Sequence, residues 1–235
     1  MISALDSTKA EVTAFVEALY RLPTIAYATN HSMMETWVAL EGLQFFRGRE
    51  WACWETLGFV TSKPVRTKDP KKNFGIKFPD IVAVRNGLTL WFEFKGICRS
   101  ALHTANLGGT LVDDALALAA FSGRETAKYL AKGTHPIARP RSDRTNIEAS
   151  GLREYGLGRR ANVGVVMLLA PGDDEVSCPA PGGPQWRPAD TIERLDGRLG
   201  VISTSLGNIS GTPTSTRPRC HVWLVPMEDG PDAGA

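Results

Sequence analysis

The sequence lacks the patterns that mark several common classes of protein. No apolar run approaches the roughly 20 residues of a membrane-spanning helix, and the chain opens with no basic-then-apolar signal pattern. Its four cysteines form no Cys-x-x-Cys pair, and its four histidines share no spacing, so no zinc site is expected. A GxxxxGK[ST] phosphate loop is also missing. We therefore expect a soluble, cytoplasmic protein with no membrane partner, with reduced thiols and without an ATPase site.

The net charge is only +2, but basic residues are concentrated in two segments. Residues 59–99 contain nine Lys or Arg against three acids, and residues 131–160 contain seven against three. A basic surface of this kind suits an anionic polymer. The predicted nucleic-acid-binding residues are Lys71, Lys72, Arg139, Arg141 and Arg144. The alternative is that these are solvated loop side chains.

Apolar periodicity, interrupted by glycine and proline, predicts alternating helices and strands. Helices are expected over residues 8–21, 32–47, 49–57 and 111–131. Strands are expected over residues 59–66, 78–85, 88–97, 163–169 and 221–225. Residues 171–219 are rich in Pro, Gly, Ser and Thr, with only a short helical pattern near 189–196. This order predicts one α/β domain with a mixed sheet.

The dipeptide Asn86-Gly87 predicts a two-residue hairpin turn, because both central residues of such a turn need a positive φ. With this turn, Asp80 stands directly opposite Glu93. Phe78 stands opposite Lys95. Opposed Cβ atoms in a sheet lie about 4.5–5.5 Å apart, where like charges repel each other. Two facing carboxylates beside a lysine therefore predict a bound divalent cation.

The hairpin has one apolar face, which a helix can cover, and a second face that ends in Asp80, Glu93 and Lys95. Mg²⁺ prefers one or two carboxylates and keeps water and phosphate oxygens as its other ligands. Such an ion stabilises the charge that builds up on phosphate and lowers the pKa of a bound water. Lys95 would orient that water or contact a phosphate oxygen. Together the three residues predict metal-dependent phosphodiester hydrolysis.

The segment Phe78-Pro79-Asp80-Ile81-Val82, followed by Glu93-Phe94-Lys95, resembles the PD-(D/E)XK nuclease superfamily, which includes many restriction endonucleases. The similarity covers roughly residues 48–130, with a looser match at 163–169. It implies a restriction-endonuclease-like αβββαβ core, with a mixed central sheet flanked by helices, that cuts DNA with Mg²⁺ or substituted Mn²⁺. It also implies that Asp80 and Glu93 bind the metal, that the Phe94 carbonyl is a further ligand, and that Lys95 is the catalytic lysine.

On this resemblance, residues 1–235 form a single nuclease-like domain. Its expected parts are the N-terminal helices (1–47), the catalytic core (48–170), a Pro/Gly-rich insertion (171–219) and a closing strand (220–227).

The family often adds a glutamate from the helix before the first strand, and three candidates compete for that role. Glu50 is preferred, because its predicted helix runs directly into the first strand. Glu41 would lie on an apolar helix face, and Glu35 would complete a capping box with Ser32. Two further acids, Asp113 and Asp114, are expected only to complement a helix dipole.

The resulting hypothesis is a Mg²⁺-dependent DNA endonuclease, and a restriction or mobile-element role is an association only. RNA is not excluded as a substrate, and double-strand cleavage would call for a homodimer or two successive nicks. The alternative is a catalytically inactive nuclease-fold protein that binds nucleic acid or acts in assembly. A third reading is an enzyme that acts on a small nucleotide.

Overall fold

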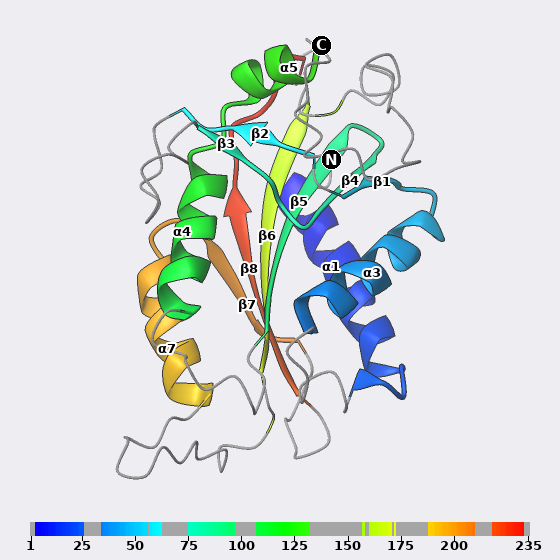
Figure 1. Ribbon diagram of the computed structural model, residues 1–235, viewed down its shortest axis with the longest axis vertical. Helices are drawn as coiled ribbons and strands as arrows, with labels where there is room; N and C mark the ends of the chain where they lie inside the picture. The colour runs from blue at the N-terminus through cyan, green and yellow to red at the C-terminus, as the bar shows by residue number, and fades with distance from the viewer. Residues whose placement is uncertain are drawn as a thin grey trace.

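The computed structural model describes residues 3–25, 34–55, 57–62, 75–96, 107–131, 157, 160–170, 172, 188–209 and 218–232. Within these residues, helices cover both faces of a mixed six-stranded sheet (Figure 1). Across the sheet, the strands are β1 (Ala52–Trp54), β4 (Ile81–Arg85), β5 (Leu88–Gly96), β6 (Ala161–Ala170), β8 (Arg219–Pro226) and β7 (Thr204–Asn208). All neighbouring pairs are antiparallel except β5 and β6, which run parallel. The predicted α/β class with a mixed sheet is confirmed.

One face of the sheet is covered by α1 (Ala4–Tyr20) and α3 (Met34–Arg47), which lie together on the right of Figure 1. Their apolar stripes pack against alternate residues of the strands, forming one core cluster. Phe46 is fully buried there, with ring centroids 5.5 Å from Phe15 and 5.0 Å from Phe92. The glycine at position 42 lets α3 lie close to the sheet, because a Cβ on Gly42 would lie 2.8 Å from Ile81 Cδ1.

The opposite face is covered by α4 (Leu107–Ala119) and α7 (Pro188–Leu199), on the left of Figure 1. The core on this side includes the fully buried Trp91 and Trp223. The Trp91 indole N–H donates to Asn162 Oδ1 over 3.1 Å, so its polar atom is satisfied inside the core. A short pair of strands, β2 (Phe59–Val60) and β3 (Ile76–Lys77), and helix α5 (Gly123–Ala131) lie at one end of this layer (Figure 1).

The hairpin register is confirmed over the length of β4. The cross-strand pairs run from Ile81↔Phe92 to Arg85↔Leu88. Asn86 and Gly87 have φ values of 51° and 81°, as the predicted turn requires. The predicted strand over 78–85 begins later, however, because β3 pairs with β2 and residues 78–80 leave the ladder.

Several predicted elements differ from the structure. Residues 52–54 form the edge strand β1, so the predicted helix over 49–57 is wrong. The first helix begins earlier than the predicted capping box, with Ser3 as its N-cap. The helix predicted over 111–131 is two helices, α4 and α5, separated at residues 120–122. The segment 171–219 is more than an irregular insertion, because it supplies α7 and the edge strand β7.

Two features bear on the environment of the chain. None of the helices in the described part of the chain is long and apolar enough to cross a membrane. Cys53 and Cys220 are free and buried, and burial raises the pKa of the Cys53 thiol to about 11. Cys98 and Cys178 lie outside the described residues.

The turn that orients the hairpin gives a direct test of the fold. Gly87→Ala should lower the free energy of unfolding by about 1 kcal/mol or more, because φ there is +81°. For a chain of this size that corresponds to a fall in Tm of about 2–4 °C. Gly197→Ala is the matched control: no atom of the described residues lies within 4 Å of its added Cβ, and it should gain up to about 1 kcal/mol in helix α7. A Gly87→Ala protein as stable as wild type in thermal denaturation would contradict the assigned turn.

Candidate functional site: an acid and lysine cluster at the end of β5

Asp80 terminates the β4–β5 ladder instead of extending it. Its backbone N–H donates to the Phe92 carbonyl over 2.9 Å. Its carboxylate oxygen Oδ2 accepts the Phe94 N–H over 2.7 Å. The side chain thus replaces the next strand residue as a hydrogen-bond acceptor, which corrects the expected face-to-face pairing of Asp80 with Glu93. The Asp80 carboxylate is fixed at the end of β5 by this bond.

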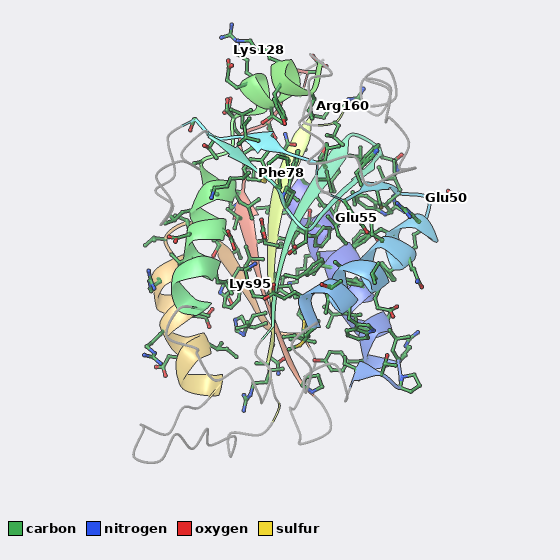
Figure 2. All side chains as sticks on the ribbon, in the orientation of Figure 1. Glu50, Glu55, Phe78, Lys95, Lys128 and Arg160 are labelled. Atoms are coloured by element: carbon green, nitrogen blue, oxygen red, sulfur yellow. The ribbon has the colours of Figure 1, made fainter. Side chains whose placement is uncertain are left out.

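Glu93 and Lys95 project from β5 into the layer between the sheet and α4. Glu93 is 8% exposed, a low value for a carboxylate. Lys95 Nζ lies 3.7 Å from Glu93 Oε2 and donates to the Phe94 carbonyl over 3.1 Å. Figure 2 shows Lys95 low on the strand, between the helical layers. A lysine ammonium therefore lies beside Glu93, one of the two carboxylates between which the sequence predicted a metal ion.

Asp114 of α4 completes the cluster, which corrects its expected role as a helix cap. Helix α4 begins at Leu107 and has no acid in its first turn, so Asp114 lies well inside it. Its Oδ2 is 3.3 Å from Lys95 Nζ. The missed signal was the spacing, because Asp114 falls on the stripe of the buried residues Leu111, Ala115 and Leu118.

The glutamate from the preceding helices that reaches this site is Glu35. Its Oε1 accepts the Gly96 N–H over 3.2 Å, from the first turn of α3. Gly96 permits the contact, because a Cβ there would lie 2.8 Å from Met34 Cε. The preferred candidate, Glu50, is exposed in a turn with φ 64° and lies at the rim of the molecule, away from Lys95 (Figure 2). Glu41 makes no contact with the cluster that the structure records.

Burial and like charge dominate the electrostatics of the cluster. Burial raises the pKa of Glu93 well above its ordinary value, and Asp114 and Asp80 raise it further. Burial also raises the pKa of Asp80, against the opposing effect of the Phe94 amide. Burial by itself would lower the pKa of Lys95, but the surrounding acids, Glu93 first, raise it above its ordinary value. The cluster is thus short of positive charge, with one ammonium among several carboxylates.

The donor atoms of this cluster suit a hard divalent cation. Carboxylate oxygens of Asp80 and Glu93 and the carbonyl of Phe94 are the ligand types that Mg²⁺ selects. Within the described residues, no three His, Cys, Asp or Glu side chains converge closely enough to hold a metal ion as they stand. The present spacing accommodates the Lys95 ammonium, so loading with a cation would require these side chains to adjust.

The predicted nucleic-acid-binding residues Lys71, Lys72, Arg139, Arg141 and Arg144 lie outside the described residues. A different group of polar residues lies at the other edge of the sheet. His221 Nε2 is 3.0 Å from Ser205 Oγ and 3.1 Å from Asp196 Oδ1. Because both partners share one ring nitrogen, the imidazole cannot relay a proton between them as in a serine hydrolase.

No family model matches the chain, and no curated protein or solved structure shows significant similarity to it. Its function must therefore be inferred from its own residues.

The burial of Glu93 has a measurable consequence for stability. Its pKa is higher in the folded than in the unfolded chain, so its contribution to stability is complete below the unfolded value and is lost as pH rises through the folded one. In EDTA, Glu93→Gln should therefore raise Tm at about pH 8 by about 2–4 °C, the shift expected for roughly 1 kcal/mol. The gain should vanish near about pH 4, where both forms are neutral.

The exposed Glu50→Gln is the matched control and should show no such pH-dependent gain. A Glu93→Gln protein less stable than wild type across this pH range would show that the carboxylate stabilises the fold.

Proposed function

We propose that this protein is a Mg²⁺-dependent DNA endonuclease that hydrolyses phosphodiester bonds through Asp80, Glu93 and Lys95. The observation that carries the proposal is the cluster of the buried Glu93 with the half-buried Lys95 and Asp114, with Asp80 fixed beside it by the Phe94 amide. Charged groups buried in this way are costly to the fold, which favours a functional reason for them. A restriction or mobile-element role remains an association drawn from the resemblance.

The succession of elements around the cluster supports a restriction-endonuclease-like core. Apart from the short β2–β3 pair and the additional helix α5 after α4, helix α3 is followed by β1, β4 and β5, then by α4 and β6, the αβββαβ order that the motif resemblance implies. The three strands β1, β4 and β5 are antiparallel, and β6 joins β5 in parallel. The short β2–β3 pair is inserted between β1 and β4.

Each residue of the cluster has a chemical role in this proposal. Asp80, Glu93 and the Phe94 carbonyl would hold the ion, and when bound the ion would neutralise phosphate charge and acidify water. Lys95 donates hydrogen bonds and positive charge toward a phosphate oxygen. Asp114 restrains the Lys95 ammonium, and Glu35 fixes the backbone of the strand at Gly96.

Supercoiled plasmid with Mg²⁺ provides the direct test. Wild type should convert it to nicked or linear DNA, and EDTA should abolish the conversion. Lys95→Met and Glu93→Ala should each lose about 100-fold or more of the rate, the range expected for a group that acts in the chemical step. Asp114→Asn should lose about 10-fold or more, as partners that orient a reactive group do.

Separate substitutions of Glu35 and Glu50 test which of these two glutamates acts in the candidate site. Glu35→Gln should lower the rate by about 10-fold, whereas Glu50→Gln should retain wild-type activity. The assignment fails if Glu93→Ala cuts as fast as wild type, or if only the Glu50 variant is impaired.

One observation favours a second candidate, a nucleic-acid-binding protein without turnover. Lys95 already supplies a cation to Glu93 and Asp114, so the cluster has an internal counter-ion. Such a protein would bind DNA with a strong dependence on salt, yet would leave plasmid intact with Mg²⁺ or Mn²⁺.

Binding of the ion itself separates the two candidates. In the nuclease, Mn²⁺ should raise the Tm of wild type by about 2–4 °C or more and should have a much smaller effect on Glu93→Gln. The same shift in both proteins would place the ion elsewhere.

A further inference from the structure

Lys77 is a second lysine near the acid cluster, but unlike Lys95 it is not held by it. Its charge acts on the site, because it opposes the rise in the pKa of both Glu93 and Asp114. Among the described residues, no carboxylate lies within ion-pair distance of its ammonium, whereas Lys95 is restrained by Glu93 and Asp114. The Lys77 ammonium is therefore available to a ligand that brings its own negative charge.

Phe78 follows Lys77 directly and is 46% exposed. Four large apolar side chains of the described residues are exposed in this way, and Phe78 is the aromatic one among them. The ring is supported from one side: a Cβ on Gly58 would lie 3.0 Å from Phe78 Cε1 and 3.1 Å from Ile76 Cγ2. Gly58 thus leaves room for the ring to rest on the β2–β3 pair, while much of its remaining surface faces solvent.

The stretch around the end of β3 and the start of β4 therefore presents, in succession, a lysine with no ion-pair partner among the described residues, an exposed aromatic ring and a carboxylate: Lys77, Phe78 and Asp80. Figure 2 labels Phe78 above Lys95 in that view, where β3 leads toward β4. A nucleotide offers the complementary groups, since its phosphate pairs with an ammonium and its base stacks on an aromatic side chain.

We propose that Lys77 and Phe78 form a nucleotide-binding subsite in which Lys77 contacts a backbone phosphate and the ring of Phe78 stacks on an unpaired base. The proposal rests on the proposed nuclease function and narrows its substrate. Bases inside a duplex are stacked on their neighbours and cannot reach such a ring. The preferred substrate is therefore single-stranded DNA, or a site at which a base is already unpaired.

Binding of fluorescent oligonucleotides in EDTA tests this subsite without cleavage. Single-stranded oligothymidine and a blunt, fully paired duplex are titrated into wild type, Phe78→Ala, Phe78→Trp and Leu40→Ala. Phe78→Ala should weaken single-strand binding by about 5- to 150-fold, the equivalent of about 1–3 kcal/mol per stacked base. Its affinity for the duplex should be unchanged, and Phe78→Trp should restore single-strand binding. Leu40→Ala, at an apolar position 50% exposed, is the matched control and should bind as wild type does.

The salt dependence of binding tests the phosphate contact separately. Lys77→Gln should reduce the slope of log affinity against log salt by about 0.7 on the single strand, the change expected for one lost phosphate contact. Phe78→Ala should leave that slope unchanged. An unaltered slope in Lys77→Gln would remove Lys77 from the subsite.

The outcomes separate this inference from the proposed function. Wild type that binds the single strand through Phe78 but cuts no DNA keeps the subsite and rejects the nuclease. Glu93-dependent cleavage with full single-strand affinity in Phe78→Ala keeps the nuclease and rejects the subsite. The subsite is also rejected if Phe78→Ala weakens both oligonucleotides equally, if Phe78→Trp fails to restore binding, or if wild type binds neither.

Discussion

The structure around the candidate site depends on neutralising buried carboxylates at the end of β5. Glu93 is almost fully buried, and an unpaired charge in such a position would cost several kcal/mol. The Lys95 ammonium relieves that cost for Glu93 and Asp114 together, and the Phe94 carbonyl accepts one of its hydrogen bonds. A fold selected only for stability would have filled this space with apolar side chains, which pack there without a desolvation penalty.

Both helical layers contribute a side chain to the end of β5. Helix α3, on one face, delivers Glu35 to the Gly96 amide. Helix α4, on the other, delivers Asp114 to Lys95. Between them, the hairpin turn at Asn86-Gly87 sets the register that brings Asp80 to the Phe94 amide. On both faces of the sheet, buried aromatic and aliphatic side chains pack around the elements that carry these polar atoms and hold them in place.

The elements that local chemistry determines were predicted well. The hairpin register follows from the Asn-Gly turn, and β6 follows from an unbroken apolar run. Strand β1 was missed because a strand of three residues is too short to show an alternating apolar pattern, and the apolar residues around it have a helical spacing. The length of helix α7 was underestimated because its sequence lies among Pro and Gly residues. Its amphipathic pattern nevertheless gives it an apolar face, which packs beside α4.

For the candidate cluster, sequence reasoning brought the strand residues together, named Glu35 only as a less favoured candidate, and missed the place of Asp114. Asp80, Glu93 and Lys95 are close in the hairpin, so spacing alone brings them together. Asp114 and Glu35 join them only through tertiary packing, because their partners, Lys95 and the Gly96 amide, are remote in sequence. The sequence around each of them favoured a role at a helix N-terminus. A charged residue on a buried helical stripe pointed to another role, but rules based on local sequence could not decide between the two.

A crystal structure of the protein grown with Mn²⁺ would test the central proposal most directly. The account predicts anomalous density bound by Glu93 and Asp80, with the Lys95 ammonium moved away from Glu93 to make room for it. Mn²⁺ found only elsewhere, with Lys95 still lying between Glu93 and Asp114, would contradict it.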